Sequence, residues 1–272
     1  MTSGIDKAKA SVEIIGEVIR LAGDDPQVKQ AAGELGKTAV TITKTINNAL
    51  LPLAAVNFAF DKARKYFSEK FELDIQEKAK KIPSESLIEP KASVAGPALQ
   101  ALAFVHEEDA LKDLFLELIA GAMDARKASI AHPAFVEILK QLQSEEAKLL
   151  KSILPNQNLP IGQIRRIGKS SKGFTVVCSH VLNIVSLGTK QPVPSLGLPA
   201  MIDNWIRLGL VDVDYDKKLT DKSGYDWLNE RPEMAAVAPE SEESEYTIEW
   251  QCGVLVVTDF GKQFARSVGI LV

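Results

Sequence analysis

The residue types best suited to chemistry in this chain are a cysteine and a histidine in the triplet Cys178-Ser179-His180. A thiol and an imidazole can act as nucleophile and base, provided that a third group orients the base. Neighbouring side chains of a strand point to opposite faces, and no acidic residue lies nearby in the sequence to orient the histidine. His106, His132 and His180 are too scattered to indicate a metal site by spacing. We therefore predict a packed thiol, assign no catalytic or metal-binding residue, and favour a protein that is not an enzyme.

A pattern similar to a phosphate-binding loop lies at residues 31–38, AAGELGKT. Such a loop needs a buried strand before it, so that backbone N–H groups converge on phosphates at a helix N-terminus. Here the preceding residues, DDPQVKQ, are polar and typical of a helix start. We interpret the segment as a turn between helices, and we predict no nucleotide and no other cofactor.

A basic cluster lies within GQIRRIGKSSKGF and consists of Arg165, Arg166, Lys169 and Lys172. With glycine and serine between them, these residues could contact phosphates through side chains and backbone amides. The helix that would enter a major groove, residues 199–208, offers only Arg207 and carries Asp203. We predict that the basic cluster either contacts a protein partner or is a solvated face, with direct nucleic-acid binding as the alternative.

The elements that must position these residues include a helical core between Ser93 and Leu142. One helix follows Glu107-Glu108-Asp109, because apolar residues then recur every three or four positions. These residues are Leu111, Leu114, Phe115, Leu118, Ile119, Ala122 and Met123. Gly96-Pro97 is expected to open a shorter buried helix before it, and His132-Pro133 a third after it. Ser144 is expected to cap a fourth helix.

Before this core, the pattern predicts long N-terminal helices. Apolar residues are spaced for one helix face over residues 5–22 and again from Lys37 to Pro52. Beyond Pro52 a near-heptad seam follows, formed by Leu53, Val56, Phe60, Ala63 and Phe67, with Phe71 and Ile75 as its extension. Such a seam requires a partner helix, and we favour one within the chain over one from another subunit.

After Leu154 the sequence becomes richer in proline and glycine. Val176–Leu187 is β-branched and apolar, and is typical of either a strand or a buried helix. A helix over residues 199–208 should end at Gly209, with a strand at 210–216 directly after it. The acidic segment 221–245 reads as an exposed loop, followed by a strand at 246–258 and a last helix from Thr258. This order is similar to a winged-helix module.

Composition narrows the class of protein. The 272 residues carry a net charge of −4, which argues against the whole molecule binding a polyanion. Two cysteines indicate no disulfide framework, and no apolar run is long enough to span a membrane, so we predict a cytoplasmic protein. The predicted fold is mainly α. It has an N-terminal helical bundle or arm and a helical core at residues 1–143, then a winged-helix-like α+β module at 144–272.

Three stretches carry a likeness to a known family: AGPALQAL, DLFLELIAGAMD and AHPAFVEILKQLQSEEAKLL. They resemble the Abi-alpha family of bacterial proteins, named for abortive infection, over about Lys37 to Leu154, with a weaker likeness at VTDFGKQF. The resemblance implies phage defence and transfers no chemistry. We therefore expect a non-enzymatic defence protein that binds a protein partner, a phage product or itself. The alternatives are a nucleic-acid-binding regulator and an effector that perturbs membranes through its N-terminal helices.

Overall fold

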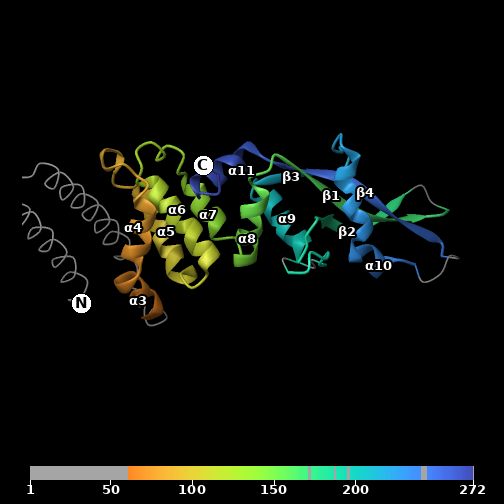
Figure 1. The fold of residues 1–272 in the computed structure, drawn as a ribbon, viewed down its shortest axis with the longest axis horizontal. Helices are drawn as coiled ribbons and strands as arrows, with labels where there is room; N and C mark the ends of the chain where they lie inside the picture. Colours follow the sequence, from red (N-terminus) through yellow and green to blue (C-terminus); the bar gives the residue numbers. More distant parts are fainter. Residues whose placement is uncertain (1–60, 171–172, 187, 195–196, 240–243, 272) are drawn as a thin grey trace, which may run out of the picture. The chain divides into compact units, whose positions relative to one another are not determined.

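A computed structural model describes residues 61–170, 173–186, 188–194, 197–239 and 244–271 (Figure 1). The predicted helices before residue 61 and the phosphate-loop-like segment lie outside these residues. The chain divides into two compact units. One, the helical unit, runs to Leu149 and resumes at Ala265; the other, the sheet unit, comprises Leu150–Phe264.

The helical unit is built around α6 (Asp109–Ala122), which packs against α4, α5 and α7 (Figure 1). The predicted apolar stripe of this helix is confirmed, because every residue from Leu111 to Met123 in that stripe is buried. The other elements of the unit are α3 (Asp61–Glu69), α4 (Phe71–Ala79), the 3₁₀ turn η1 (Ser84–Ser86), α5 (Ala92–Val105), α7 (Pro133–Leu139) and the start of α8 (Ser144–Ile153).

The predicted starts of α7 and α8 carry capping contacts. The His132 ring accepts a hydrogen bond from Ala134 N at 3.1 Å, and Pro133 occupies the first position of α7. At α8, Glu146 reaches back to accept from Gln143 N at 2.7 Å. The prediction that Gly96-Pro97 opens a helix is wrong, because α5 already begins at Ala92 and contains Pro97. Pro97 is the sixth residue of this helix, beyond its first turn, so α5 lacks the hydrogen bond that residue 97 would otherwise donate to the Ser93 carbonyl.

The described part of the predicted seam is packed inside the helical unit. Ala63, Phe67, Phe71 and Ile75 are all buried, which agrees with an intramolecular partner. The residues of the seam before Asp61 lie outside the described part of the chain.

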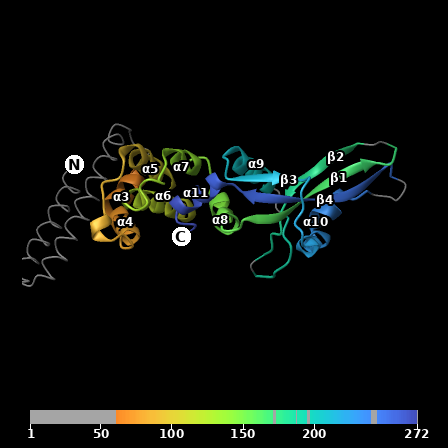
Figure 2. The same ribbon diagram turned by 90° about the horizontal axis from the view of Figure 1, so that it is seen from above.

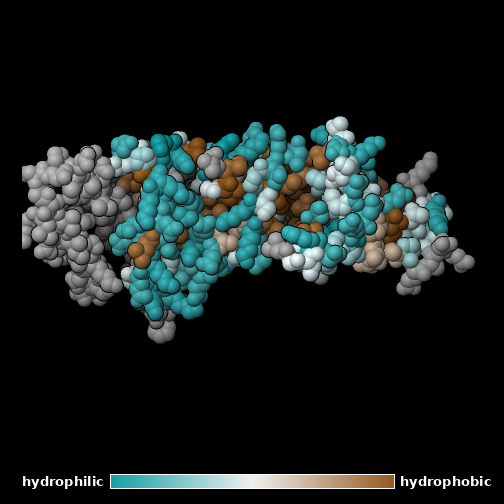
Figure 3. Space-filling model, viewed as in Figure 1, coloured by the Kyte–Doolittle hydropathy of each residue, from teal (hydrophilic) through white to brown (hydrophobic). Residues whose placement is uncertain are grey.

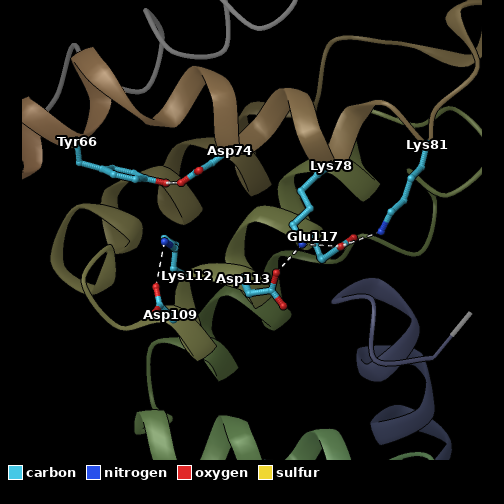
Figure 4. A network of polar contacts seen from close by, with 8 residues as sticks. All are labelled: Tyr66, Asp74, Lys78, Lys81, Asp109, Lys112, Asp113 and Glu117. Atoms are coloured by element: carbon cyan, nitrogen blue, oxygen red, sulfur yellow. Dashed lines mark hydrogen bonds and ion pairs between the residues drawn. The ribbon is translucent and has the colours of Figure 1, made fainter.

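Ion pairs join α4 to α6 at the edge of this core (Figure 4). Lys78 Nζ lies 3.0 Å from Glu117 and also contacts Asp113, while Lys81 reaches Glu117 from further along the chain. Burial opposes the charge on Lys78, but hydrogen bonds to the two carboxylates outweigh it and raise the pKa of this lysine. These contacts fix the register between the two helices.

The sheet unit contains a four-stranded antiparallel sheet of order β2-β1-β4-β3 (Figure 2). The strands are β1 (Asn158–Gly168), β2 (Phe174–Val181), β3 (Val211–Asp214) and β4 (Tyr246–Val257). Strand β1 pairs with β4 along its whole length, from Asn158↔Val256 to Gly168↔Tyr246. Helix α9 (Leu198–Arg207) packs against β2 and β3, and buries Ile202 and Trp205.

The predicted fold class, mainly α with a winged-helix-like module, is wrong: the fold mixes helices with a sheet of long strands. The longest element that the sequence did not predict is β1, because Pro160, Gly162 and the adjacent arginines are not typical of a strand. Residues 161–164 are buried in succession, so apolar and polar residues do not alternate there. The helix at 198–207 and the strands β3 and β4 lie where the sequence predicted them. Val176–Leu187, left open between strand and helix, begins within strand β2.

The segment 221–245, predicted as an exposed loop, instead folds in part against the sheet. It contains the 3₁₀ helix η2 (Lys222–Glu230) and α10 (Pro232–Val237). Tyr225 and Leu228 are buried, and Tyr225 Oη donates to Gly253 O at 2.9 Å. The prediction of an exposed loop was based on the acidic composition of the segment and did not take these two buried residues into account.

Arg231 lies between η2 and α10, and its side chain is fully buried. Its guanidinium binds both carboxylate oxygens of Glu233. It also donates to Ile184 O at 2.7 Å and to Val193 O at 2.9 Å. Arg231 therefore ties the loop after β2 to the start of α10.

The last helix, α11 (Asp259–Ser267), begins with a tight capping arrangement. Thr258 Oγ1 accepts from Gly261 N at 2.8 Å and donates to Gly209 O at 2.6 Å. A side chain at Gly261 would overlap the Leu210 carbonyl oxygen, so glycine is required by close approach of two backbones. This explains the TDFG residues within the VTDFGKQF stretch.

Candidate functional site

A chain of polar side chains crosses one region of the sheet unit, and its first part joins α9, β2 and the residue after β3. His180 Nε2 lies 3.2 Å from Asp203 Oδ1, and its Nδ1 lies 3.1 Å from Tyr215 Oη. Tyr215 Oη also accepts from His180 N at 3.1 Å and lies 3.3 Å from Gly162 O. His180 has a positive φ of 55°, which is uncommon for this residue type. The tyrosine thus holds a strained backbone position in place.

The second part of the chain continues across β4 and β1. Gln251 Nε2 donates to Tyr215 O at 2.8 Å, and its Oε1 accepts from Arg165 Nη1 at 3.1 Å. With its amide oxygen turned towards the guanidinium, Gln163 accepts from Arg165 at 2.7 and 2.8 Å. We call the residues Asp203, His180, Tyr215, Gln251, Arg165 and Gln163 the polar network.

Burial sets the protonation states within this network. It lowers the pKa of His180, an effect that the nearby Asp203 carboxylate partly offsets, so the ring is neutral at pH 7. Burial also raises the pKa of Tyr215 to about 12 and raises the pKa of the neighbouring Cys178 thiol, with Glu233 adding to the latter. The network therefore consists of neutral groups between an exposed carboxylate and an arginine.

The same geometry argues against nucleophilic catalysis at Cys178. A reactive cysteine is a thiolate in an electropositive surrounding, whereas here burial favours the thiol. Both ring nitrogens of His180 already have partners in Asp203 and Tyr215. The acid that the sequence did not provide near His180 is supplied by α9, 23 residues further on, and spacing alone gave no sign of it. In the described residues, no three His, Cys, Asp or Glu side chains group as metal ligands would.

The predicted basic cluster lies at the end of β1 and in the turn to β2. Because part of it lies on a strand, its side chains are distributed over both faces of the sheet. Arg165 and Arg166 are neighbours on β1, so their side chains point to opposite faces of the sheet. The Arg165 guanidinium lies 4.0 Å from the centre of the Phe174 ring, and that of Arg166 lies 4.5 Å from the Tyr246 ring. Each arginine is held against an aromatic ring, which the spacing of charges did not predict.

The rest of the cluster lies in the turn. Lys169 N donates to Glu245 O at 2.8 Å, and Lys172 lies outside the described residues. Two apolar side chains are exposed beside them, Phe174 by 53% and Val176 by 42%, which the spacing of charges and apolar residues did not indicate. We call Arg165, Arg166, Lys169, Phe174, Val176 and Tyr246 the hairpin surface. Figure 3 shows apolar surface among hydrophilic side chains along the strands.

The described helices include none with both the length and the apolar character needed to cross a membrane. A family model described as abortive infection alpha matches residues 63–268, which is most of the chain. No curated protein and no solved structure matches it.

Proposed function

The chain belongs to the abortive infection alpha family, and we propose that it serves phage defence by binding another protein through the hairpin surface. The family supports the role in abortive infection. Binding, the kind of partner and the surface used are our proposal.

The observation that carries the proposal is the exposure of Phe174 and Val176 on an edge strand. Protein-binding surfaces are enriched in aromatic residues and arginine, and such residues supply much of the binding energy. Arg165 and Arg166 are held by aromatic rings on the two faces beside this edge. Little side-chain freedom is then lost when a partner binds.

Nucleic-acid binding, the alternative, has less support from the placement of the charges. Arg165 and Arg166 point to opposite faces, so their charges do not combine into one basic surface. Glu249 is directly opposite Arg165 in the register, and Glu245 adjoins the turn. The third alternative, membrane perturbation, depends on N-terminal helices that lie mainly outside the described residues.

A plaque assay tests the proposal. Bacteria expressing the chain are challenged with a panel of phages and compared with cells carrying Phe174→Ser/Val176→Ser. We expect the wild-type chain to lower the efficiency of plating at least tenfold for a susceptible phage, and the double variant to lose this protection. Leu73→Ser is the matched control, because Leu73 is an apolar residue on α4 with 67% exposure.

Full protection by the double variant, at equal protein level, would refute the role of the hairpin surface. Salt-sensitive retention on DNA or RNA that is lost in Arg165→Glu/Arg166→Glu would favour the alternative instead.

A further inference from the structure

The two halves of β2 differ in how readily their outer edge could pair with a further strand. From Val176 to Val181 the pairing with β1 is interrupted by two register shifts, the residues become half-buried, and α9 packs against the strand. From Phe174 to Val176 the pairing is regular, and all three side chains are exposed. Native edge strands are usually blunted by charge, proline or bulges, and this first half carries none of them.

The opposite edge of the sheet shows the usual protection. Strand β3 has four residues and carries Asp212 and Asp214. The Asp212 carboxylate accepts from Val213 N at 2.9 Å, and Asp214 pairs with Lys217. A further strand is therefore resisted at β3, whereas the first half of β2 remains open to one.

The charge around β2 indicates what such a strand would carry. The β1–β2 hairpin, residues 158–181, contains no acidic residue and four basic ones: Arg165, Arg166, Lys169 and Lys172. Glu245 and Glu249 belong to the β4 side of β1, further from the outer edge of β2. The chain as a whole has a net charge of −4, so the positive charge of the hairpin is opposite in sign to that of the whole chain. An acidic ligand is attracted to it, and a second copy pairing β2 to β2 would place like charges together.

We propose that the open half of β2, Phe174–Val176, accepts an extended acidic peptide segment of a partner protein as an added strand. This inference rests on the proposed function and specifies its partner. Main-chain hydrogen bonds to the edge of β2, exposed in the described part of the chain, would give affinity. Apolar side chains on one face of the added strand would meet Phe174 and Val176, and the alternating acidic ones would lie on the face of Arg166.

Fluorescence anisotropy with the full chain tests this inference. The probe is a labelled ten-residue peptide in which glutamate alternates with valine. The comparison peptides replace glutamate by lysine, or replace every second valine by proline so that strand pairing is blocked. We expect the acidic peptide to bind at least tenfold more tightly than either, with affinity falling as salt rises. Thr175→Glu/Val176→Glu should weaken it at least tenfold, because the new carboxylates repel the peptide and charge the edge strand, and Leu73→Glu should leave it unchanged.

Equal binding of the acidic and lysine peptides would overturn the inference, as would equal binding of the proline peptide, which would indicate attraction without strand addition. Sedimentation showing a dimer that Thr175→Glu/Val176→Glu dissociates would make a second copy the occupant and also overturn it. If the peptides fail to bind while Phe174→Ser/Val176→Ser still loses protection against phage, the proposed function stands without this inference. Circular dichroism of each variant separates lost binding from lost folding.

Discussion

Replacing Arg231 by methionine should strongly destabilise the sheet unit. The side chain is fully buried and makes two contacts with Glu233 and one with each of two backbone carbonyls, Ile184 and Val193. Methionine has a similar length but no donor. Its introduction leaves the Glu233 carboxylate, with 14% exposure, without its cation and removes the guanidinium donors from two carbonyl oxygens, of which Ile184 O keeps the bond from Val193 N at 3.1 Å.

The expected cost follows from the group left behind. Removing one member of a buried ion pair typically costs about 3–5 kcal/mol, because the other charge stays buried and uncompensated. With a urea dependence of about 2 kcal/mol per molar, the midpoint of unfolding should fall by about 2 M. The double variant Arg231→Met/Glu233→Gln should recover part of this loss, since it removes the uncompensated charge.

Tryptophan fluorescence in urea measures the effect in the right part of the molecule. The three tryptophans, Trp205, Trp227 and Trp250, all lie in the sheet unit. Arg207→Met is the control, because it makes the same chemical change on the exposed side of α9 and should cost less than about 0.5 kcal/mol. A change of less than about 1 kcal/mol for Arg231→Met would show that solvent replaces these contacts and that our reasoning about burial is wrong.

Three further changes test other parts of the structure. Gly261→Ala should cost about 1–3 kcal/mol because its methyl group meets the Leu210 carbonyl. Gly121→Ala in α6 should gain about 0.5–1 kcal/mol, because a methyl group there meets the Ser267 carbonyl oxygen at an ordinary 3.5 Å. Thermal unfolding followed by circular dichroism compares the two variants, and equal effects would contradict the close approach at Gly261. Leu118→Ala should cost about 2–5 kcal/mol, measured by the same method, since its side chain is fully buried in α6. Because burial lowers the pKa of His180, whose ring faces Asp203 and Tyr215, the folded state binds this proton less readily than the unfolded state. Stability of the sheet unit should therefore fall as pH decreases below about 6.5 towards the folded pKa. His180→Asn should reduce the dependence of the unfolding free energy on pH between pH 7.5 and 5.5. An unchanged dependence would show that a group other than His180 binds the proton.

The helical unit follows closely from its sequence because its information is local. Apolar residues three and four positions apart identify α6, and a histidine before a proline marks the start of α7. Such patterns depend on neighbours within one or two turns, so no knowledge of the rest of the fold is needed.

The sheet unit depends on partners distant in sequence. The prediction there locates α9, β3 and β4, but it misses β1 and the folded part of segment 221–245. Strand β1 contains Pro160 and Gly162, which usually interrupt strands, and a run of four buried residues. It is a strand nevertheless, because it pairs with β2 on one side and with β4 on the other. The polar network is even more difficult to predict from the sequence, because Asp203 reaches His180 only when α9 packs against β2. The basic residues were identified as a surface, but their separation onto two faces requires knowing that they occupy a strand.

The division of the chain has a consequence for protein synthesis. The helical unit is interrupted by the whole sheet unit and regains its last segment only at Ala265, where Ser267 Oγ donates to Ile130 O at 2.9 Å and Gly269 approaches Glu117. A ribosome must translate Leu150–Phe264 before it delivers the segment that completes the helices made earlier. A nascent chain that has not passed Ala265 therefore lacks part of that unit, so its full stability, and any activity that depends on it, arises only after this segment has been translated.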